Sequence, residues 1–191
     1  MRIFGIDPGS ERTGYGCLET EGSATRLVAC GAVSAVAGDA FPQRLARIHR
    51  ELSELLVSCD PDCVAIESLF YAVNVRSALK LGHARGVAML AAVEAGCPVV
   101  EYTPAEIKRA VAGYGRAEKH QVQQMSKLLL GLDQLPSPHD AADALAVAIC
   151  HLHTLSSYTG ADLKVHSYKD AASPRGPLPR TWRQYRPPTN G

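Results

Sequence analysis

The first part of the chain alternates between apolar and polar positions in three short runs separated by turn residues. The runs span residues 2–7, 13–19 and 25–35, and the segments that join them contain Asp-Pro-Gly and Glu-Gly-Ser. Connections this short favour antiparallel neighbours, because a parallel pair of strands needs a long crossover. The pattern therefore predicts an antiparallel meander of three strands.

Beyond the meander, helical and strand patterns alternate. Apolar residues fall three and four positions apart from Phe41 to Leu56, which predicts a helix that ends before Pro61. The apolar run 63–67 is typical of a buried parallel strand, and a long helical stretch at 74–95 follows it. Later patterns predict a strand at 99–102 and helices that begin at 103, 117 and 140. This order indicates an α/β fold in which a mixed sheet is flanked by helices.

Composition divides the chain into one domain and a tail. Residues 1–154 have an ordinary globular mixture, whereas residues 155–191 contain five prolines, six basic residues and the only tryptophan. Such a segment cannot build a core of its own, so we expect a disordered tail. The six cysteines form no Cys-x-x-Cys pair, and no apolar run reaches the roughly 18 residues of a membrane span. These features predict a protein of the reducing cytoplasm.

The net charge of +1 hides a strong asymmetry along the sequence. Residues 1–75 carry six basic and ten acidic side chains, whereas residues 76–127 carry eight basic and four acidic ones. A basic middle section beside acidic flanks can bind a polyanion locally, although solvated helix faces would give the same charge count.

Four carboxylates stand out by their positions in this pattern. Asp7 and Glu67 each end a predicted strand, and Asp140 and Asp143 lie three apart on one face at the start of the last helix. Carboxylate oxygens are ligands that Mg²⁺ prefers, and two ions held side by side can clamp both the attacking and the leaving oxygen of a phosphodiester. A cluster of these acids would need such cations, because two like charges roughly 4 Å apart repel by about 4 kcal/mol.

Each acid also has an ordinary structural explanation. Asp7 precedes a proline and could form a turn, Asp140 could cap the helix, and Asp143 could favour the positive end of the helix dipole. Glu67 is harder to explain in this way, because it ends the most apolar strand of the chain. Spacing alone does not show that the four acids converge.

Five segments resemble the RuvC family of bacterial Holliday junction resolvases, in the family's order. They are Gly5-Ile6-Asp7-Pro8-Gly9-Ser10 with Thr13-Gly14-Tyr15-Gly16, Ala65-Ile66-Glu67 with Phe70 and Asn74, 77–82 with 84–88, Ala117-Glu118-Lys119 with 121–123, and 140–146. The resemblance covers roughly residues 1–153. It implies a ribonuclease H-like fold, a homodimer, and paired nicking of four-way DNA junctions during recombination and repair.

By the same resemblance, the four acids are catalytic carboxylates that bind two Mg²⁺ or Mn²⁺ ions in each active site. Lys119 is implied as a catalytic lysine beside them, since a lysine there could stabilise the charge that develops on the scissile phosphate. The family pattern also places a lysine at the position of Lys108, near the active site, where it could bind DNA. The implied partners are junction DNA, a second copy of the chain and branch-migration motor proteins of the RuvA/RuvB type.

Further candidate DNA contacts surround the long helix. Phe70 resembles the family's aromatic residue that stacks on a base at the junction. Arg76, Lys80 and Arg85 could follow phosphates. Each also fits an ordinary role, as a solvated helix residue or, for Phe70, as part of the core.

Gly82 and Gly86 lie four apart on one face of the long helix. Glycine costs about 1 kcal/mol relative to alanine inside a helix, so the pair indicates the close approach of another backbone, from the same subunit or from a second one. The family pairs its subunits through this helix, and a twofold dimer would match the two equivalent strands of a junction.

Other functions fit parts of the pattern. A different ribonuclease H-like nuclease would cut an RNA–DNA hybrid or a single strand. Gly-Ile-Asp-x-Gly also opens the phosphate loop of actin- and Hsp70-like ATPases, but those folds use two such halves and the chain has one copy. A non-catalytic junction-binding scaffold would gain from losing acids beside DNA. His139 fits a loop histidine, and Cys59 and Cys63 lack the second half of a zinc site.

Overall fold

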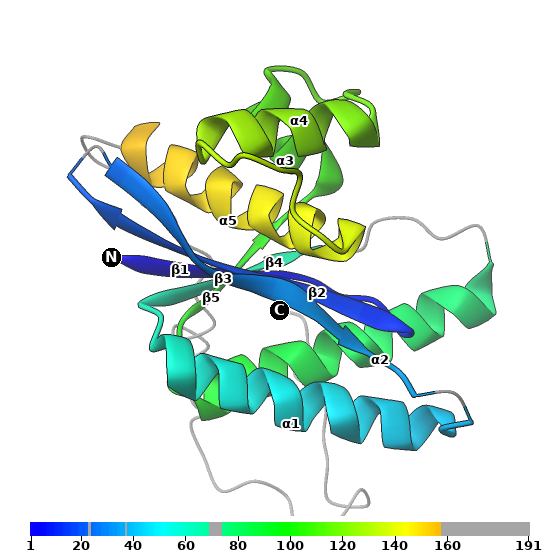
Figure 1. Cartoon of the computed structure of the whole chain (residues 1–191). Helices are drawn as coiled ribbons and strands as arrows, with labels where there is room; N and C mark the ends of the chain where they lie inside the picture. The colour runs from blue at the N-terminus through cyan, green and yellow to red at the C-terminus, as the bar shows by residue number, and fades with distance from the viewer. Residues whose placement is uncertain (23, 37, 69–73, 158–191) are drawn as a thin grey trace, which may run out of the picture.

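The computed structural model describes residues 1–157 apart from 23, 37 and 69–73, and shows a sheet between two layers of helices (Figure 1). The sheet has five strands in the order β3-β2-β1-β4-β5. Phe70 and almost all of the predicted tail lie outside the described residues, so the expectations about them stay predictions.

The three N-terminal strands form the predicted meander. β1 (Arg2–Asp7) pairs antiparallel with β2 (Arg12–Glu21), and β2 pairs antiparallel with β3 (Ala24–Ser34). β4 (Cys63–Glu67) pairs parallel with β1, and β5 (Val99–Tyr102) pairs parallel with β4. The expected mixed sheet, in which a meander is continued by parallel strands, is confirmed.

Helices cover both faces of the sheet (Figure 1). α1 (Phe41–Cys59) and α2 (Val75–Glu94) lie on one face, and α5 (His139–Ser157) lies on the other. α3 (Pro104–Ala112) and α4 (Lys119–Leu129) pack on α5. In the described part of the chain, no helix combines the length and the hydropathy that a membrane crossing requires.

Local sequence signals set the helix ends. The Thr103 hydroxyl accepts a hydrogen bond from the backbone N–H of Glu106 at 3.3 Å, and the Glu106 carboxylate accepts one from the backbone N–H of Thr103 at 2.7 Å, as the capping sequence predicted. α1 ends at Asp60, whose backbone is left-handed with φ 46°. α5 continues past Thr154, into the segment that composition assigned to the tail.

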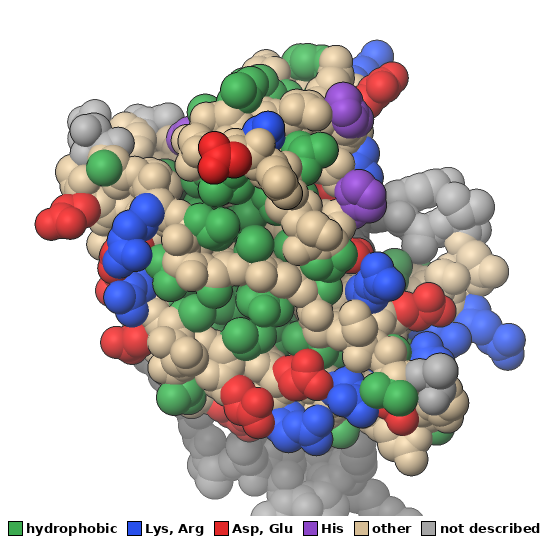
Figure 2. Space-filling model, viewed as in Figure 1, with side chains coloured by type: hydrophobic (Ala, Val, Ile, Leu, Met, Phe, Trp, Pro, Cys, Tyr) green, Lys and Arg blue, Asp and Glu red, His purple; other side chains and the backbone are tan. Residues whose placement is uncertain are grey.

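Alternation along the strands divides the apolar core into two layers. Phe4 and Ile6 point toward α1 and α2, whereas Ile3 and Ala65 point toward α5 and its Leu145. β3 forms one edge of the sheet between these layers, and Figure 2 shows hydrophobic side chains along this edge with charged side chains around its margin. On this side of the molecule, the charged side chains therefore lie mostly around the hydrophobic surface and not within it.

Two glycines let α5 approach the strands closely. A Cβ on Gly5 would lie 2.1 Å from the carbonyl oxygen of Ala144, and a Cβ on Gly14 would lie 2.0 Å from that of Asp140. Side-chain atoms do not come so near to a backbone oxygen, so only glycine fits at either position. The helix side of the contact is also small, since Ala144 and Ala148 are fully buried. The first turns of α5 are thereby held in direct backbone contact with the strands.

Gly5→Ala is expected to destabilise the protein by about 1–3 kcal/mol, because a methyl group added to a well-packed contact forces the backbone to shift. Urea unfolding followed by circular dichroism would show a lower midpoint with an unchanged slope. Ser34→Ala, at an exposed position at the end of β3, is the control and should change the free energy of unfolding by less than about 0.5 kcal/mol. A Gly5→Ala protein as stable as the wild type would contradict the close packing of α5.

Candidate active site

Two of the four acids lie side by side at the ends of neighbouring strands. β1 and β4 are parallel and in register, so Asp7 and Glu67 come at the same end of the sheet. Both side chains point to the α5 face, because side chains alternate along a strand and Gly5 and Ala65 already face that helix. Both acids are half-buried there.

The other two acids come from the first turns of α5. Gly14 pairs with Asp7 across β1 and β2, and its Cα is the atom against which the backbone of Asp140 packs. The backbone of Asp140 therefore lies near the end of β1, with only Gly14 of β2 between them. Asp143 lies three residues further along the helix, close enough for its negative charge to raise the pKa of both Asp7 and Glu67.

Burial and mutual repulsion perturb the acid pair on the strands. Burial raises the pKa of Asp7 to about 8, and the negative charges of Glu67 and Asp143 shift it in the same direction. Burial also raises the pKa of Glu67, and a hydrogen bond with Asp7 offsets part of that rise. Burial and the mutual repulsion of the carboxylates therefore both favour the protonated form of this pair.

Lysines from two helices face these acids. The Nζ atom of Lys119, the first residue of α4, lies 2.6 Å from Oδ2 of Asp143. This hydrogen bond raises the pKa of Lys119, and the charges of Asp7 and Asp140 act in the same direction. The positive charge of Lys108 on α3 lowers the pKa of Glu67. The lysines and the acids that the sequence singled out are thus brought to one region of the molecule.

Arg12 is a third cation at this region, and the sequence analysis did not single it out. Its Nη1 atom lies 3.9 Å from Oδ2 of Asp140. The signal that could have found it is the hairpin itself. Because Gly14 pairs with Asp7, the residues just before Gly14, including Arg12, must lie near the end of β1.

Three other predicted phosphate contacts lie on α2 and have different partners. The Nζ atom of Lys80 lies 5.8 Å from the centroid of the Phe41 ring. Arg76 lies in the first turn, where its backbone N–H takes part in the N-cap. The guanidinium of Arg85 is paired with the carboxylate of Glu101. For Arg76, Lys80 and Arg85, DNA binding stays a prediction.

The surface around Gly82 and Gly86 is open. A Cβ on either glycine would meet nothing within 4 Å in the described part of the chain. None of the described residues of the same subunit therefore provides the close backbone approach that was one of the two explanations considered from the sequence. Large apolar side chains are also exposed along this helix; they are Val75, Leu79, Leu90 and Val93. The helix thus presents an apolar surface without a partner among the described residues.

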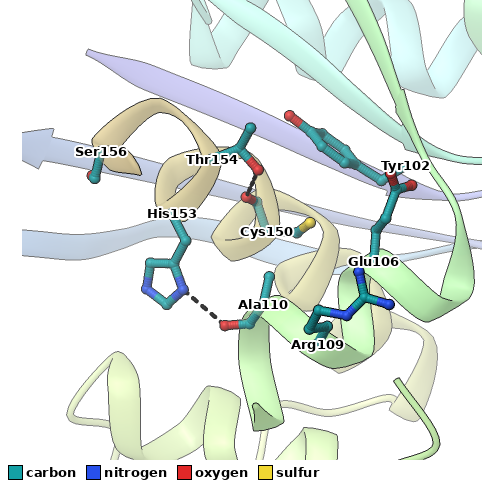
Figure 3. A pocket seen from close by; sticks show the side chains of 8 residues that line it. All are labelled: Tyr102, Glu106, Arg109, Ala110, Cys150, His153, Thr154 and Ser156. Atoms are coloured by element: carbon teal, nitrogen blue, oxygen red, sulfur yellow. Dashed lines mark hydrogen bonds between the residues drawn. The ribbon is translucent and has the colours of Figure 1, made fainter. Parts of the chain in front are cut away.

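A separate cavity lies beside the C-terminal half of α5 and contains none of the four acids (Figure 3). Its volume is about 630 Å³, and its lining residues are Tyr102, Glu106, Arg109, Ala110, Cys150, His153, Thr154 and Ser156.

The groups around this cavity have structural partners. Nδ1 of His153 lies 2.9 Å from the carbonyl oxygen of Ala110, and the Tyr102 hydroxyl lies 2.7 Å from Nδ1 of the buried His151. Burial raises the pKa of Cys150 to about 12, so it is a protonated thiol at neutral pH. The two histidines fit the structural role expected of them, and the thiol of Cys150 is not activated as a nucleophile.

The acids supply the donor set that a hard divalent cation requires. In the described residues, no three His, Cys, Asp or Glu side chains are already drawn together as metal ligands. Asp7, Glu67, Asp140 and Asp143 nevertheless offer only carboxylate oxygens, and the repulsion that raises the pKa of Asp7 is relieved by a positive charge. The residues therefore fit a cation of the Mg²⁺ type.

The chain matches one protein family over most of its length. The family model described as crossover junction endodeoxyribonuclease RuvC matches residues 3–151. A protein of this name from Koribacter versatilis is 54% identical over 160 residues, which are 83% of this chain and 96% of the relative. Another, from Syntrophomonas wolfei, is 49% identical over 160 residues, which are 83% of this chain and 93% of the relative.

Solved structures agree with this match. The structure of Thermus thermophilus RuvC has a TM-score of 0.76 and 37% sequence identity, and the match covers 82% of this chain and 96% of that one. The structure of T. thermophilus RuvC in complex with Holliday junction substrate has a TM-score of 0.77, 36% identity and the same coverage. The ribonuclease H-like fold expected from the resemblance is confirmed, and a nuclease is favoured over the ATPase alternative.

Asp7→Asn is expected to raise the melting temperature of the metal-free protein at pH 8. The pKa of Asp7, near 3.8 in the unfolded chain, is about 8 in the native state, so the native state holds a proton that the unfolded chain has released. The free energy of unfolding therefore falls as the pH rises from about 4 to 8. An amide cannot ionise, so the melting temperature of the variant should exceed that of the wild type by a few degrees at pH 8 and by less at pH 5. Each kcal/mol of unfolding free energy corresponds to about 2–4 °C. Thermal melts in EDTA at the two pH values measure this difference.

Asp133→Asn makes the same change at an exposed position and should leave both melting temperatures unaltered. Added Mg²⁺ should raise the melting temperature of the wild type more than that of Asp7→Asn, since the variant has lost one ligand. If Asp7→Asn melted below the wild type in EDTA at pH 8, the repulsive acid cluster would be wrong.

Proposed function

The chain belongs to the RuvC family of crossover junction endodeoxyribonucleases, and we propose that it cuts four-way DNA junctions by metal-dependent hydrolysis at the acid cluster. The observation that carries the proposal is the position of Asp7 and Glu67 side by side at the ends of β1 and β4, close enough to Asp143 for the three carboxylates to influence one another. In a purely structural cluster, each acid would be paired with a basic side chain. Asp7 and Glu67 instead keep excess negative charge, and the lysines near them, Lys108 and Lys119, are at positions that resemble the family pattern. Such a pair is suited to cation binding.

The four carboxylates, Asp7, Glu67, Asp140 and Asp143, would hold two Mg²⁺ or Mn²⁺ ions. Bound there, the ions would activate water and stabilise the leaving 3′-oxygen of the phosphodiester. The strand ladder holds the backbones of Asp7 and Glu67 side by side, and the contact with Gly14 holds the backbone of Asp140 near them, so movements of the side chains alone would bring these carboxylates around a cation. Because the pKa values of Asp7 and Glu67 are raised, cation binding would release any proton that these carboxylates hold.

Lys119 is suited to contact the scissile phosphate. Its side chain is 63% exposed while its Nζ touches Asp143, so it can exchange a carboxylate oxygen for a phosphate oxygen without crossing the protein. A positive charge held there would stabilise the negative charge that develops during hydrolysis. Lys108 acts on Glu67 from the neighbouring helix and would add to the attraction for the DNA backbone. Arg76, Lys80 and Phe70 complete the proposed DNA contacts.

The exposed stripe on α2 is the proposed homodimer interface. Val75, Leu79, Gly82, Gly86 and Leu90 follow one another at intervals of three or four residues, so they share one face of the helix. The two glycines add no side chain to this face, which lets a second α2 approach closely. A twofold dimer would present two identical active sites to the two opposed strands of a junction.

The proposal extends to the setting of the enzyme. Junction cleavage would follow the action of branch-migration motor proteins of the RuvA/RuvB type, in the cytoplasm where chromosomal DNA is found. We propose that the nuclease domain extends to the end of α5 at Ser157, three residues beyond the boundary predicted from composition; the rest of the predicted tail lies outside the described residues.

Substitution of any one of the four acids by its amide is expected to lower the rate of junction cleavage by at least about a hundredfold while binding is retained, because each removes an oxygen ligand but little bulk. The measurement is cleavage of a labelled mobile four-way junction in Mg²⁺ and in Mn²⁺, with binding followed by fluorescence anisotropy in EDTA. The wild type should leave paired nicks that a ligase can seal.

Asp133→Asn is the matched control and should cleave at the wild-type rate. The same assay with a linear duplex and an RNA–DNA hybrid separates a junction nuclease from another ribonuclease H-like nuclease. Undiminished cleavage by Glu67→Gln, or preference for the hybrid, would overturn the proposed function.

Leu79→Glu is expected to convert the protein from a dimer to a monomer, because it places a charge on an apolar face that a second copy would bury. Sedimentation velocity should give about twice the chain mass of 20.4 kDa for the wild type and the single mass for the variant. Val57→Glu, at a position of α1 that is 78% exposed, is the control and should stay dimeric. A wild type that is monomeric at all concentrations would rule out the α2 interface.

A further inference from the structure

Arg12 is an exposed cation at the mouth of the acid cluster. It is the first residue of β2, its side chain is 59% exposed, and its Nη1 lies 3.9 Å from Oδ2 of Asp140. The known chemistry of the cluster needs no arginine at this position, since Asp140 is there to bind a cation. The position of Arg12 therefore calls for another explanation.

The backbone that carries Arg12 is held rigidly against the active site. The hydroxyl of the fully buried Thr13 donates a hydrogen bond to the carbonyl oxygen of Gly9 at 2.9 Å, which closes the turn between β1 and β2. On the other side, Gly14 packs against the backbone of Asp140. The backbone position of Arg12 is thus fixed, while its long side chain can extend away from the protein.

The contact with Asp140 is too loose to explain Arg12 as a stabilising residue. By contrast, Nε of Arg2 donates a hydrogen bond to Oε1 of Glu19 at 2.9 Å, and the same guanidinium donates a second hydrogen bond to a backbone carbonyl. The Arg12 guanidinium makes a single approach near 4 Å in a largely exposed setting, where an ion pair contributes little to stability. Most of its five donors remain available, and they match the geometry of a phosphate.

Arg12 and Lys119 flank the acids from two different elements. Lys119 approaches Asp143 from α4, and Arg12 approaches Asp140 from β2. A DNA strand whose phosphate reaches the acids would therefore come near cations from both elements. Building on the proposed function, we propose that Arg12 binds the DNA backbone at a phosphate next to the scissile one and so positions the strand over the acid cluster.

The test is the salt dependence of junction binding by Arg12→Gln. Anisotropy titrations of a labelled four-way junction in EDTA, between about 50 and 200 mM salt, give the slope of log affinity against log salt. Loss of one phosphate contact should reduce the magnitude of this slope by about 0.9 and weaken binding by about fivefold at the lower salt. Arg12→Lys should recover the slope, since it restores the charge, but only part of the affinity.

Arg50→Gln, at an exposed arginine of α1, is the matched control and should bind as the wild type does. Thermal melts should give Arg12→Gln the wild-type melting temperature. The proposal is overturned if Arg12→Gln keeps the wild-type slope and affinity, or if its melting temperature falls as it would for a structural residue. A wild type that neither binds nor cleaves junctions in parallel reactions would instead indicate that the proposed function has failed.

Discussion

The structure depends on the close approach of one helix to one sheet. Gly5 and Gly14 bring the strands into backbone contact with Ala144 and Asp140 of α5, and any side chain at either glycine would hold the helix away. Two acids end strands and two begin the helix, so the same contact decides whether the four carboxylates meet. The glycine-rich sequence near the N-terminus is therefore a packing requirement, and the chemistry of the site follows from it.

This arrangement of acids at the candidate active site lowers the stability of the folded protein. Burial next to Glu67 and Asp143 shifts the pKa of Asp7 to about 8, which is a cost that a structural carboxylate would avoid by pairing with an arginine. Lys119 compensates for part of the negative charge through its ion pair with Asp143, but the pKa values of Asp7 and Glu67 stay raised. The site is thus incomplete without an additional positive charge, which is a property expected of a metal-dependent active site.

Much of the fold could be predicted from local pattern, because the turn residues of the meander, the capping sequence at Thr103 and the apolar run that ends at Glu67 each act within a few residues. The acids could be proposed from their places at element ends. The family resemblance was needed to bring them together, since convergence depends on strand order. Arg12 was missed because its relation to Asp140 exists only across the hairpin and the helix. For Gly82 and Gly86, the sequence indicated an approaching backbone but not that the described part of the same subunit would leave both positions open.

One active site of this kind cannot by itself distinguish a junction from an ordinary duplex. Its proposed DNA-binding cations, Arg12, Lys108 and Lys119, would recognise phosphate, and phosphates are the same in every DNA. Discrimination must therefore come from a geometry larger than one site, such as the spacing and orientation of two sites in a rigid pair. The exposed stripe on α2 is the feature among the described residues that can fix such a pair, because the helix that carries it packs on the opposite face of the sheet from α5. Affinity would then arise within each subunit, and specificity for the branched structure would arise between subunits.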